Sequence, residues 1–209
     1  AVLAPSVHHP NSRFGFDVAI DGGTVVVGAP GADIAENASY TGGAFVFTGA
    51  GASWTEQAAL QPTTADDEEA GERVALEGDT VVVGAPEADT RAGAAYVFTR
   101  TGGVWSERLR LTPATPTAGD EFGASGLTLA DGVLMITSQH LNSSTGGVHV
   151  FTGGGASWTE HTVLVPGGAA PGDLFGSDIA VDDGTAAIGA AGTGGDTGAV
   201  HIFTGGGAS

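Results

Sequence analysis

Residues 14–30 read FGFDVAIDGGTVVVGAP, and nearly the same stretch returns three more times along the chain. The copies begin at Phe14, Ala70, Phe122 and Phe175, at steps of 56, 52 and 53 residues. A self-similar period near fifty residues is typical of repeat architectures, in which one unit cannot bury its apolar face alone and stacks on its neighbours. The sequence therefore predicts one repeat domain over residues 1–209, with repeats at approximately 1–56, 57–107, 108–160 and 161–209.

Each repeat holds four short runs with strand character. Val25, Val26 and Val27 form a continuous β-branched run, which is typical of a strand buried on both faces. A Gly/Asp joint such as Asp21-Gly22-Gly23 links the first two runs, as tight hairpins require. No window has helical periodicity, and 37 glycines would weaken any helix. The chain is predicted to be all-β, with strands in the first copy at residues 14–20, 24–28, 44–48 and 54–60.

Four-stranded antiparallel units that recur every ~52 residues favour a β-propeller, because radial stacking buries both faces of each small sheet. A β-sandwich or a β-solenoid is the structural alternative, although solenoids usually repeat faster. Each four-stranded unit would be one blade.

The recurring motifs resemble the FG-GAP repeat of integrin-α-type β-propellers and of many microbial surface proteins. The resemblance rests on Phe-Gly at Phe14, Phe122 and Phe175, on Gly-Ala-Pro at residues 28–30 and 84–86, and on a tryptophan in order after them. It implies a propeller of about seven blades at the cell exterior. Four repeats therefore form a four-bladed ring, part of a larger propeller, or an arc that a second chain completes.

The tryptophans show where the chain is cut within a repeat. Trp54, Trp105 and Trp158 open the last strand of their copies, and a fourth is due just after Ser209. Residues 1–5 match the segment that follows such a tryptophan. The N-terminal segment is thus a candidate to complete blade 4, and the incomplete outer strand is a candidate for self-association.

The chain is strongly acidic. Six cations, all arginine, stand against 24 acidic residues, for a formal net charge of −18. Salt screens the repulsion in such a chain, so the composition resembles that of proteins from halophilic archaea. An acidic secreted protein from a GC-rich bacterial genome is the alternative. The charge argues against nucleic acid and anionic membranes, and no apolar stretch is long enough for membrane insertion.

No metal or cofactor site is expected. The joints between the first and second strands hold too few oxygen ligands for the calcium loop of the integrin family. Without cysteine, no thiolate metal site exists. Of the histidines, His149 and His201 occupy the positions of Phe45 and Tyr96, where a role in packing between blades is expected, and His8 and His9 lack a spaced partner.

One face of the propeller should carry the loops from second to third strand together with the loops that lead to the next blade. The resemblance makes this the ligand face, and loops on rigid scaffolds often carry function. A hydrated acidic rim that serves salt tolerance is the alternative. The candidate residues for ligand or partner contact are Asp33, Glu36, Tyr40, Asp66, Asp67, Glu87, Asp89, Arg91, His140 and Asp173.

Two sequons, at Asn37 and Asn142, occupy equivalent loops of copies one and three and are candidates for N-glycosylation. Catalysis has little support. The sequence has no serine, cysteine and histidine pattern typical of nucleophilic catalysis, and nothing distinguishes a carboxylate such as Glu121 as a buried catalytic acid.

The sequence favours a non-catalytic, secreted or cell-surface propeller that mediates adhesion, protein–protein interaction or self-assembly at high salt. A glycan-binding, lectin-like module and a structural subunit of a surface filament or layer are the alternatives. The partner would be a protein or glycan on a cell surface.

Overall fold

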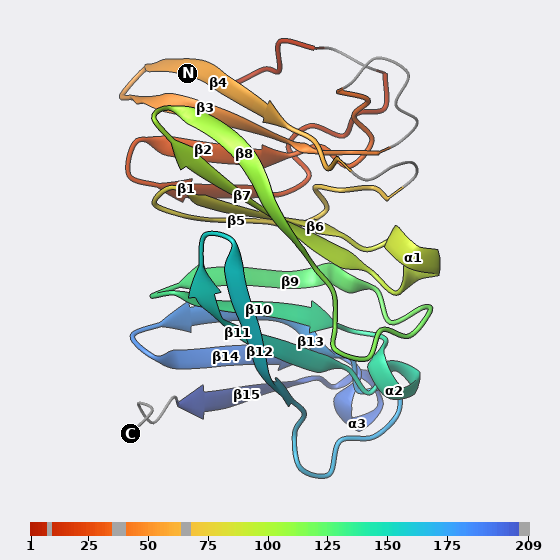
Figure 1. The fold of residues 1–209 in the computed structure, drawn as a ribbon. Helices are drawn as coiled ribbons and strands as arrows, with labels where there is room; N and C mark the ends of the chain where they lie inside the picture. The colour runs from red at the N-terminus through yellow and green to blue at the C-terminus, as the bar shows by residue number, and fades with distance from the viewer. Residues whose placement is uncertain (8–9, 35–40, 64–67, 205–209) are drawn as a thin grey trace.

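The computed structural model describes residues 1–7, 10–34, 41–63 and 68–204, and it is all-β (Figure 1). Four antiparallel sheets follow one another along the chain, and each keeps its strands in sequence order. We call them blades 1 to 4. Blade 1 contains β1 (Val18–Asp21), β2 (Thr24–Gly28), β3 (Ala44–Ala50) and β4 (Ser53–Leu60); blade 2 contains β5 (Val74–Glu77), β6 (Thr80–Ala85), β7 (Ala94–Thr101) and β8 (Val104–Leu111); blade 3 contains β9 (Phe122–Ala130), β10 (Val133–Ser138), β11 (Gly147–Gly154) and β12 (Ser157–Leu164); blade 4 contains β13 (Phe175–Asp182), β14 (Thr185–Ala190) and β15 (Ala199–Thr204).

The prediction of β-propeller blades is confirmed. The first two strands of every blade are joined by two-residue turns whose first residue has a positive φ, between 43° at Asp183 and 54° at Gly78. The first strand of blade 1 is shorter than expected and begins at Val18, because residues 14–17 bend before the ladder starts. Blade 4 has three strands among the described residues, and residues 205–209 lie outside them.

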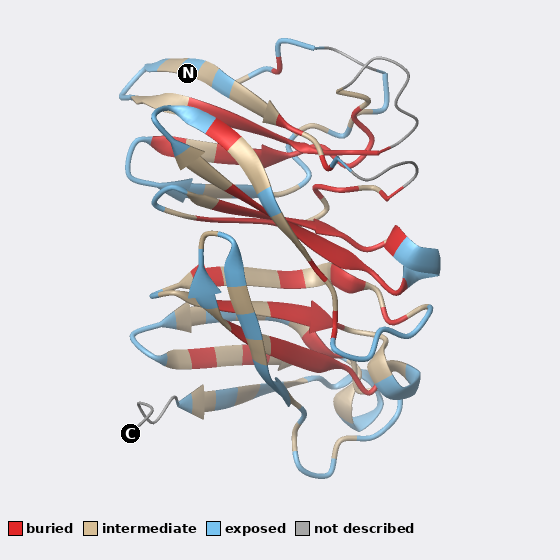
Figure 2. Ribbon diagram, viewed as in Figure 1, coloured by how far each residue is buried: buried red, intermediate tan, exposed pale blue. Residues whose placement is uncertain are grey.

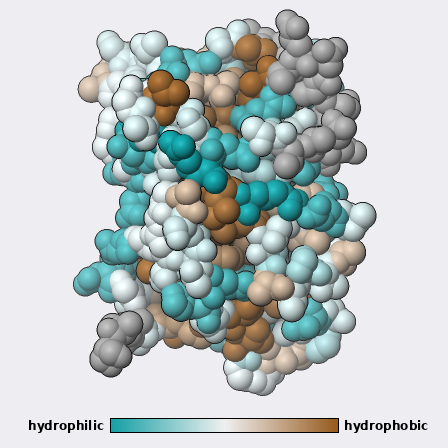
Figure 3. All heavy atoms as spheres, in the orientation of Figure 1, coloured by the Kyte–Doolittle hydropathy of each residue, from teal (hydrophilic) through white to brown (hydrophobic). Residues whose placement is uncertain are grey.

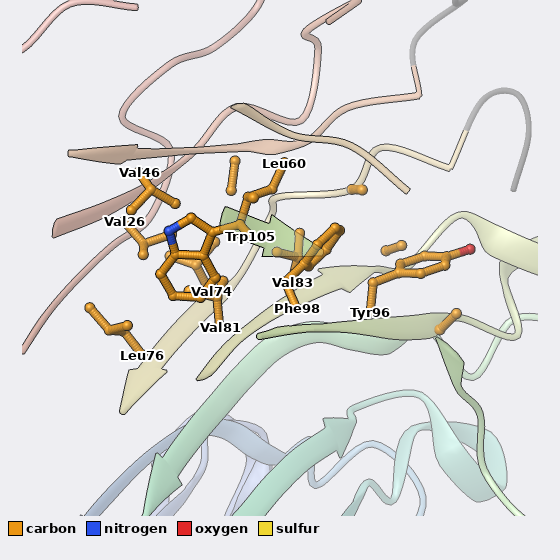
Figure 4. Packing of buried hydrophobic residues seen from close by; sticks show 14 of the residues in the cluster. Val26, Val46, Leu60, Val74, Leu76, Val81, Val83, Tyr96, Phe98 and Trp105 are labelled. Atoms are coloured by element: carbon orange, nitrogen blue, oxygen red, sulfur yellow. The ribbon is translucent and has the colours of Figure 1, made fainter. Parts of the chain in front are cut away.

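The apolar core lies between blades rather than within one sheet (Figure 2). Each blade has a leading face, which packs on the preceding blade, and a trailing face, which packs on the following one. Between blades 1 and 2, Val26 and Val46 of the trailing face meet Val81, Phe98 and other residues of the leading face (Figure 4). Similar clusters join blades 2 and 3 and blades 3 and 4. In blade 2, Val81 and Val83 pack toward blade 1 and Val82 packs toward blade 3, so both faces of the strand are buried, which explains the continuous valine run.

The first residue of the Phe-Gly motif pairs through its backbone with the preceding blade. Parallel bridges join Gly42 to Ala70, Gly93 to Phe122 and Gly146 to Phe175, always across two blades. Gly71, which follows Ala70, has a φ of 102°. A Cβ at Gly71 would lie 2.2 Å from the carbonyl oxygen of Gly43. Only glycine satisfies both the left-handed backbone and this close approach.

The row of blades is open at its two ends. On the leading face of blade 1, the side chains of Val18 and Ile20 are 63% and 68% exposed, whereas their equivalents in blade 2, Val74 and Leu76, are 4% and 8% exposed. Within the described residues, no blade covers Val18 and Ile20.

The trailing face of blade 4 is equally uncovered. Val200 and Ile202 are 68% and 62% exposed, but Val148 and Val97, at the equivalent positions of blades 3 and 2, are fully buried. In the part of the chain that the structure describes, blades 1 and 4 stand at opposite ends of the stack (Figure 1).

The N-terminal segment does not complete blade 4, contrary to one arrangement that its sequence allows. Leu3 packs with Phe14, Phe45 and other residues on the leading face of blade 1. The backbone N–H and the hydroxyl of Ser6 both donate to the Glu56 carboxylate, at 2.7 Å each. Thr63 makes the same pair of bonds with Glu107 in blade 2. The N-terminal segment therefore occupies, next to blade 1, the place that the residues after β4 occupy next to blade 2.

Three four-residue helical elements, α1 (Ala88–Arg91), α2 (Leu141–Ser144) and α3 (Thr193–Asp196), interrupt the strands. None was expected from the sequence. They are not ordinary right-handed helices, because their central residues have φ between 52° and 71°. Each one is a left-handed turn at the same place in its blade, between the second and third strands.

Candidate functional site

The two sets of loops share one face of the molecule, as the sequence predicts. The carbonyl oxygen of Arg91, in α1, accepts the backbone N–H groups of Gly119 and Glu121, at 3.0 and 2.9 Å. In the next blade, the carbonyl oxygen of Ser144 accepts from Gly172 and Leu174 in the same way. In Figure 1, α1, α2 and α3 all lie on this side, opposite the two-residue hairpins. We call it the loop face.

Arg91 stands at the centre of a cluster of charged side chains on the loop face. Its Nε lies 3.3 Å from Glu87, one turn earlier, and its Nη2 donates to the carboxylate of Glu121. The other oxygen of Glu121 lies 3.2 Å from Nε2 of His140. The Nδ1 atom of His140 lies 3.0 Å from the Ser144 hydroxyl, which completes a chain of contacts from blade 2 to blade 3. The side chain of Arg91 remains 56% exposed, so this cluster is open to a partner.

A second cluster lies beside α1 and is more buried. Tyr96 is fully buried, and its hydroxyl donates to Glu68 at 2.5 Å. Arg110, on the neighbouring strand, donates to the Tyr96 oxygen at 2.9 Å and to Asp89 at 2.8 Å. This network links the loop before blade 2 to α1 and to β8.

Burial and hydrogen bonding shift two pKa values in the second cluster. Burial raises the pKa of the Glu68 carboxyl, although the hydrogen bond from Tyr96 and the charge of Arg110 oppose the change. Burial of the Arg110 guanidinium would lower its pKa, but the hydrogen bonds with Asp89 and Tyr96 outweigh burial and raise the pKa above its ordinary value.

A third cluster joins blades 1 and 2. Arg13 donates to the carboxylate of Glu69. Burial raises the pKa of the nearby Glu72 carboxyl, and the charge of Glu69 raises it further, against the effects of Arg13 and Arg73. Three of the six arginines, Arg13, Arg91 and Arg110, thus pair with carboxylates of the loop face.

The residue before each Phe-Gly position is a feature that sequence reasoning missed. Arg13, Glu69, Glu121 and Leu174 occupy this position, and all have a left-handed φ between 48° and 55°. Their side chains supply both partners of the Arg13–Glu69 pair and the carboxylate beside Arg91. The only signal in the sequence is that each of these residues directly precedes the Phe-Gly position, because their side chains have no chemistry in common.

Four of the predicted partner-face residues are connected by these clusters: Glu87 and Arg91 directly, His140 through Glu121, and Asp89 through Arg110. Asp33 is half-buried in blade 1. Asp173 accepts the backbone N–H of Ala170 at 2.7 Å within its own loop, apart from the Arg91 cluster. Four further predicted residues, Glu36, Tyr40, Asp66 and Asp67, lie outside the described residues.

The sequon at Asn142 lies on the exposed α2 turn, where its side chain is accessible. The sequon at Asn37 lies outside the described residues. Glycosylation remains a prediction for both.

His149 and His201 each pack against the phenylalanine that opens their own blade, and their packing between blades stays a prediction. His149 is 3% exposed and contacts the edge of Phe122, with ring centroids 5.1 Å apart; His201 contacts Phe175 in the same way. His149 also lies 2.7 Å from Glu160 and 3.1 Å from the Ser138 hydroxyl. Among the described residues, no three His, Asp or Glu side chains are grouped so that they could hold a metal ion. His8 and His9 fall outside those residues.

No helix within the described ranges has the length and apolar character that a membrane span needs. No match was found among curated proteins. The family model of the FG-GAP repeat matches residues 1–47, 54–98 and 158–203, which together make up more than half of the chain. With its blades, its Phe-Gly bridges and these three matches, the chain belongs to the FG-GAP repeat family.

Proposed function

We propose that this chain is a non-catalytic β-propeller module of the cell exterior, which mediates adhesion, protein–protein contact or self-assembly at high salt. FG-GAP repeats are typical of protein-interaction modules and of extracellular or surface proteins, and they are typically non-catalytic. The role in adhesion or assembly at high salt rests on the loop face and on the charge of the chain.

The Arg91 cluster is the observation that carries the proposal. Rigid blades hold its members in place, since Arg91 and His140 both reach Glu121, which comes directly before the first residue of β9. A half-exposed arginine with oriented carboxylates suits recognition of a polar partner, because arginine is enriched among the residues that dominate binding energy at interfaces. The same pairing argues against catalysis, since Glu121 contacts an arginine instead of standing as an isolated acid.

An extracellular location is in accord with the chemistry of the chain. It contains no cysteine that oxidation could alter, and its lysine-free surface with a formal charge of −18 suits a saline medium. Charge also restricts the partners, because nucleic acid and anionic lipid would be repelled.

A bead-adhesion assay tests the role of the loop face. Beads that carry the whole chain are washed over cell-envelope fragments of the organism that carries the gene, in molar NaCl, and the retained fraction is measured. We expect Arg91→Ala to weaken retention about tenfold, as for a binding hot spot. Arg108→Ala is the matched control, because Arg108 is also exposed and also in blade 2 but lies on β8.

Equal retention of both variants would contradict the proposal, and so would absence of retention of the unaltered chain. Hydrolysis of an envelope glycan that depends on Glu121 would overturn the non-catalytic assignment.

A further inference from the structure

A groove runs along the first strands of the blades, on the side away from the outer strands. Each blade keeps its strands in sequence order, so β1, β5, β9 and β13 form one row of sheet edges, and β4, β8 and β12 form the opposite row. β8 and β12 cross the front of the view in Figures 1 and 3. The groove follows the other row, where a propeller has its axis. It has a volume of about 330 Å³ and a mostly polar lining.

One position of the repeat lines this groove in all four blades. It lies three residues after the first residue of the Phe-Gly motif and is occupied by Asp17, Arg73, Ser125 and Asp178. The carboxylate of Asp17 accepts the backbone N–H of Val18 at 2.9 Å and that of Val74, in blade 2, at 2.8 Å. Asp17 is therefore used to join blades 1 and 2.

Arg73 brings a positive charge into the groove. Its Nε donates to the carbonyl oxygen of Ser125, in blade 3, at 2.5 Å, and its Nη1 donates to the carbonyl oxygen of Glu72 at 2.7 Å. These two bonds fix the plane of the guanidinium, so little side-chain freedom is lost when a ligand binds to its remaining edge. Blade 2 also has a described neighbour on each side, so the surroundings of Arg73 are those of an internal blade.

No carboxylate neutralises Arg73 within the described ranges. Four arginines lie within 4.0 Å of a carboxylate oxygen, and they are Arg13, Arg91, Arg100 and Arg110. Arg108 has no such partner in the same ranges, but it is exposed on β8, where water solvates it. Arg73 is half-buried, and its Nη2 has no acceptor among the described residues. A partly desolvated guanidinium with free donors is the feature that a bound anion would explain.

We propose that the groove binds a small organic monocarboxylate, whose two oxygens accept hydrogen bonds from Nη1 and Nη2 of Arg73. The planar edge of a guanidinium matches the two oxygens of a carboxylate. Leu127, which also lines the groove and is half-buried, offers an apolar surface to a short alkyl chain. This binding site goes beyond the proposed role of the loop face and does not depend on it.

The charges around the groove favour a ligand with a single negative charge. Asp17 and Asp178 belong to the same lining, and each would repel a second negative charge on the ligand. The formal charge of −18 acts over a short range in brine, because the screening length is about 3 Å at 1 M salt. A monocarboxylate can therefore reach Arg73 at high salt.

Saturation-transfer NMR tests the proposal with sodium propionate, added to the whole chain in molar NaCl. We expect saturable transfer to the propionate methyl group and no saturable transfer to propionamide, which has nearly the same shape but no charge. Arg73→Gln should weaken propionate binding at least about tenfold, because it removes the charged fork. Arg108→Gln is the matched control, since it removes the same charge from β8, outside the lining of the groove.

A second variant separates ligand binding from the link that Arg73 makes between blades 2 and 3. Arg73→Lys keeps the positive charge but has no planar fork, so it should also bind propionate more weakly than the unaltered chain. The melting temperature of each variant is measured without ligand, and binding is measured well below it. A lower stability is then not counted as lost binding, and if Arg73→Gln does not fold, Arg73→Lys provides the comparison.

Saturable propionate binding that requires the Arg73 guanidinium and is unchanged in Arg108→Gln supports the proposal. The proposal is overturned if propionate does not bind, if propionamide binds equally well, or if the Arg73 variants bind propionate as tightly as Arg108→Gln.

Discussion

Glu68 illustrates how single carboxyl groups are used in this acidic protein. Its side chain is 10% exposed, and it accepts a hydrogen bond from the buried Tyr96 hydroxyl. Burial nevertheless dominates and raises its pKa above the ordinary value of 4.5. The charged form is thus less favourable in the folded protein than in the unfolded chain.

We expect Glu68→Gln to be at least as stable as the unaltered chain at pH 7. Between the ordinary pKa and the raised one, the folded protein binds more protons than the unfolded chain, so the stability contributed at this site falls as the pH rises through that window. The glutamine removes the charge and still accepts from Tyr96. Melting temperatures measured from pH 7 down to pH ~4.5 should show the advantage of the variant shrinking.

Asp183→Asn, at an exposed hairpin, is the control for the loss of one carboxylate charge. An advantage of Glu68→Gln that grows toward acid pH would contradict the assignment.

At the scale of single residues, the sequence allowed a prediction where a residue could be aligned with its equivalents in the other repeats. His149 and His201 were assigned to packing between blades because they align with Phe45 and Tyr96, and each makes a T-shaped contact with a phenylalanine of its own blade. The salt bridges of Glu121 and Arg110 were not foreseeable, because they depend on which loops meet across blades. A tyrosine in place of phenylalanine at position 96 was the one available sign of a buried polar partner.

The left-handed turns are the main surprise among the elements. Asn142, Ser143 and Ser144 in α2 all have φ between 52° and 63°. In blade 4 the first two of these positions are Gly194 and Gly195, which take this conformation without strain. That pair of glycines was the only feature of the sequence that indicated a left-handed turn, and it occurs only in the fourth repeat.

We expect Ser143→Gly to stabilise the protein by about 0.5–1 kcal/mol. The left-handed backbone costs an L-residue about 1–2 kcal/mol, and glycine avoids this cost but loses about 0.5–1 kcal/mol of extra chain entropy. Urea unfolding in molar NaCl measures the change. Ser157→Gly, in a strand with ordinary backbone, should instead destabilise by a similar amount. Destabilisation by both variants would show that α2 is not left-handed.

Strand positions were predictable because valine runs and Gly/Asp joints are local signals. The outer strands were located by their tryptophans, and β4, β8 and β12 all begin one residue before it. The hydrogen bonding of the tryptophan indole groups was not predictable. Among the described residues, the buried indole N–H of Trp158 has no acceptor, because Arg108 occupies the position from which Gln57 accepts the indole N–H of Trp105.

At the scale of the whole molecule, charge should control stability. With a formal charge of −18, we expect the melting temperature to rise by more than about 5 °C between about 0.1 M and about 1 M NaCl, as the screening length falls from about 10 Å to about 3 Å. Differential scanning calorimetry measures this rise. Sucrose at matched osmolality separates charge screening from surface exclusion, and a flat melting temperature in NaCl would contradict the high-salt role.

The number of blades was predictable, but the state of the ends was not. Four copies of one motif dictate four sheets, whereas closure depends on whether blade 4 meets blade 1. In the part of the chain that the structure describes, both end faces are uncovered, and Leu3 lies on blade 1 rather than on β15.

The open row of blades with two exposed apolar ends is the central claim, and cysteine labelling tests it most directly. Single variants Ile20→Cys and Ile202→Cys probe the ends, Leu76→Cys probes the internal position equivalent to Ile20, and Val104→Cys is an exposed reference on β8. In dilute solution at molar salt, we predict that the two end cysteines react with a thiol reagent as fast as the reference, and that the cysteine at position 76 is strongly protected. Protection of positions 20 and 202 to the same degree as position 76 would show that the blades close into a ring, and it would contradict the account.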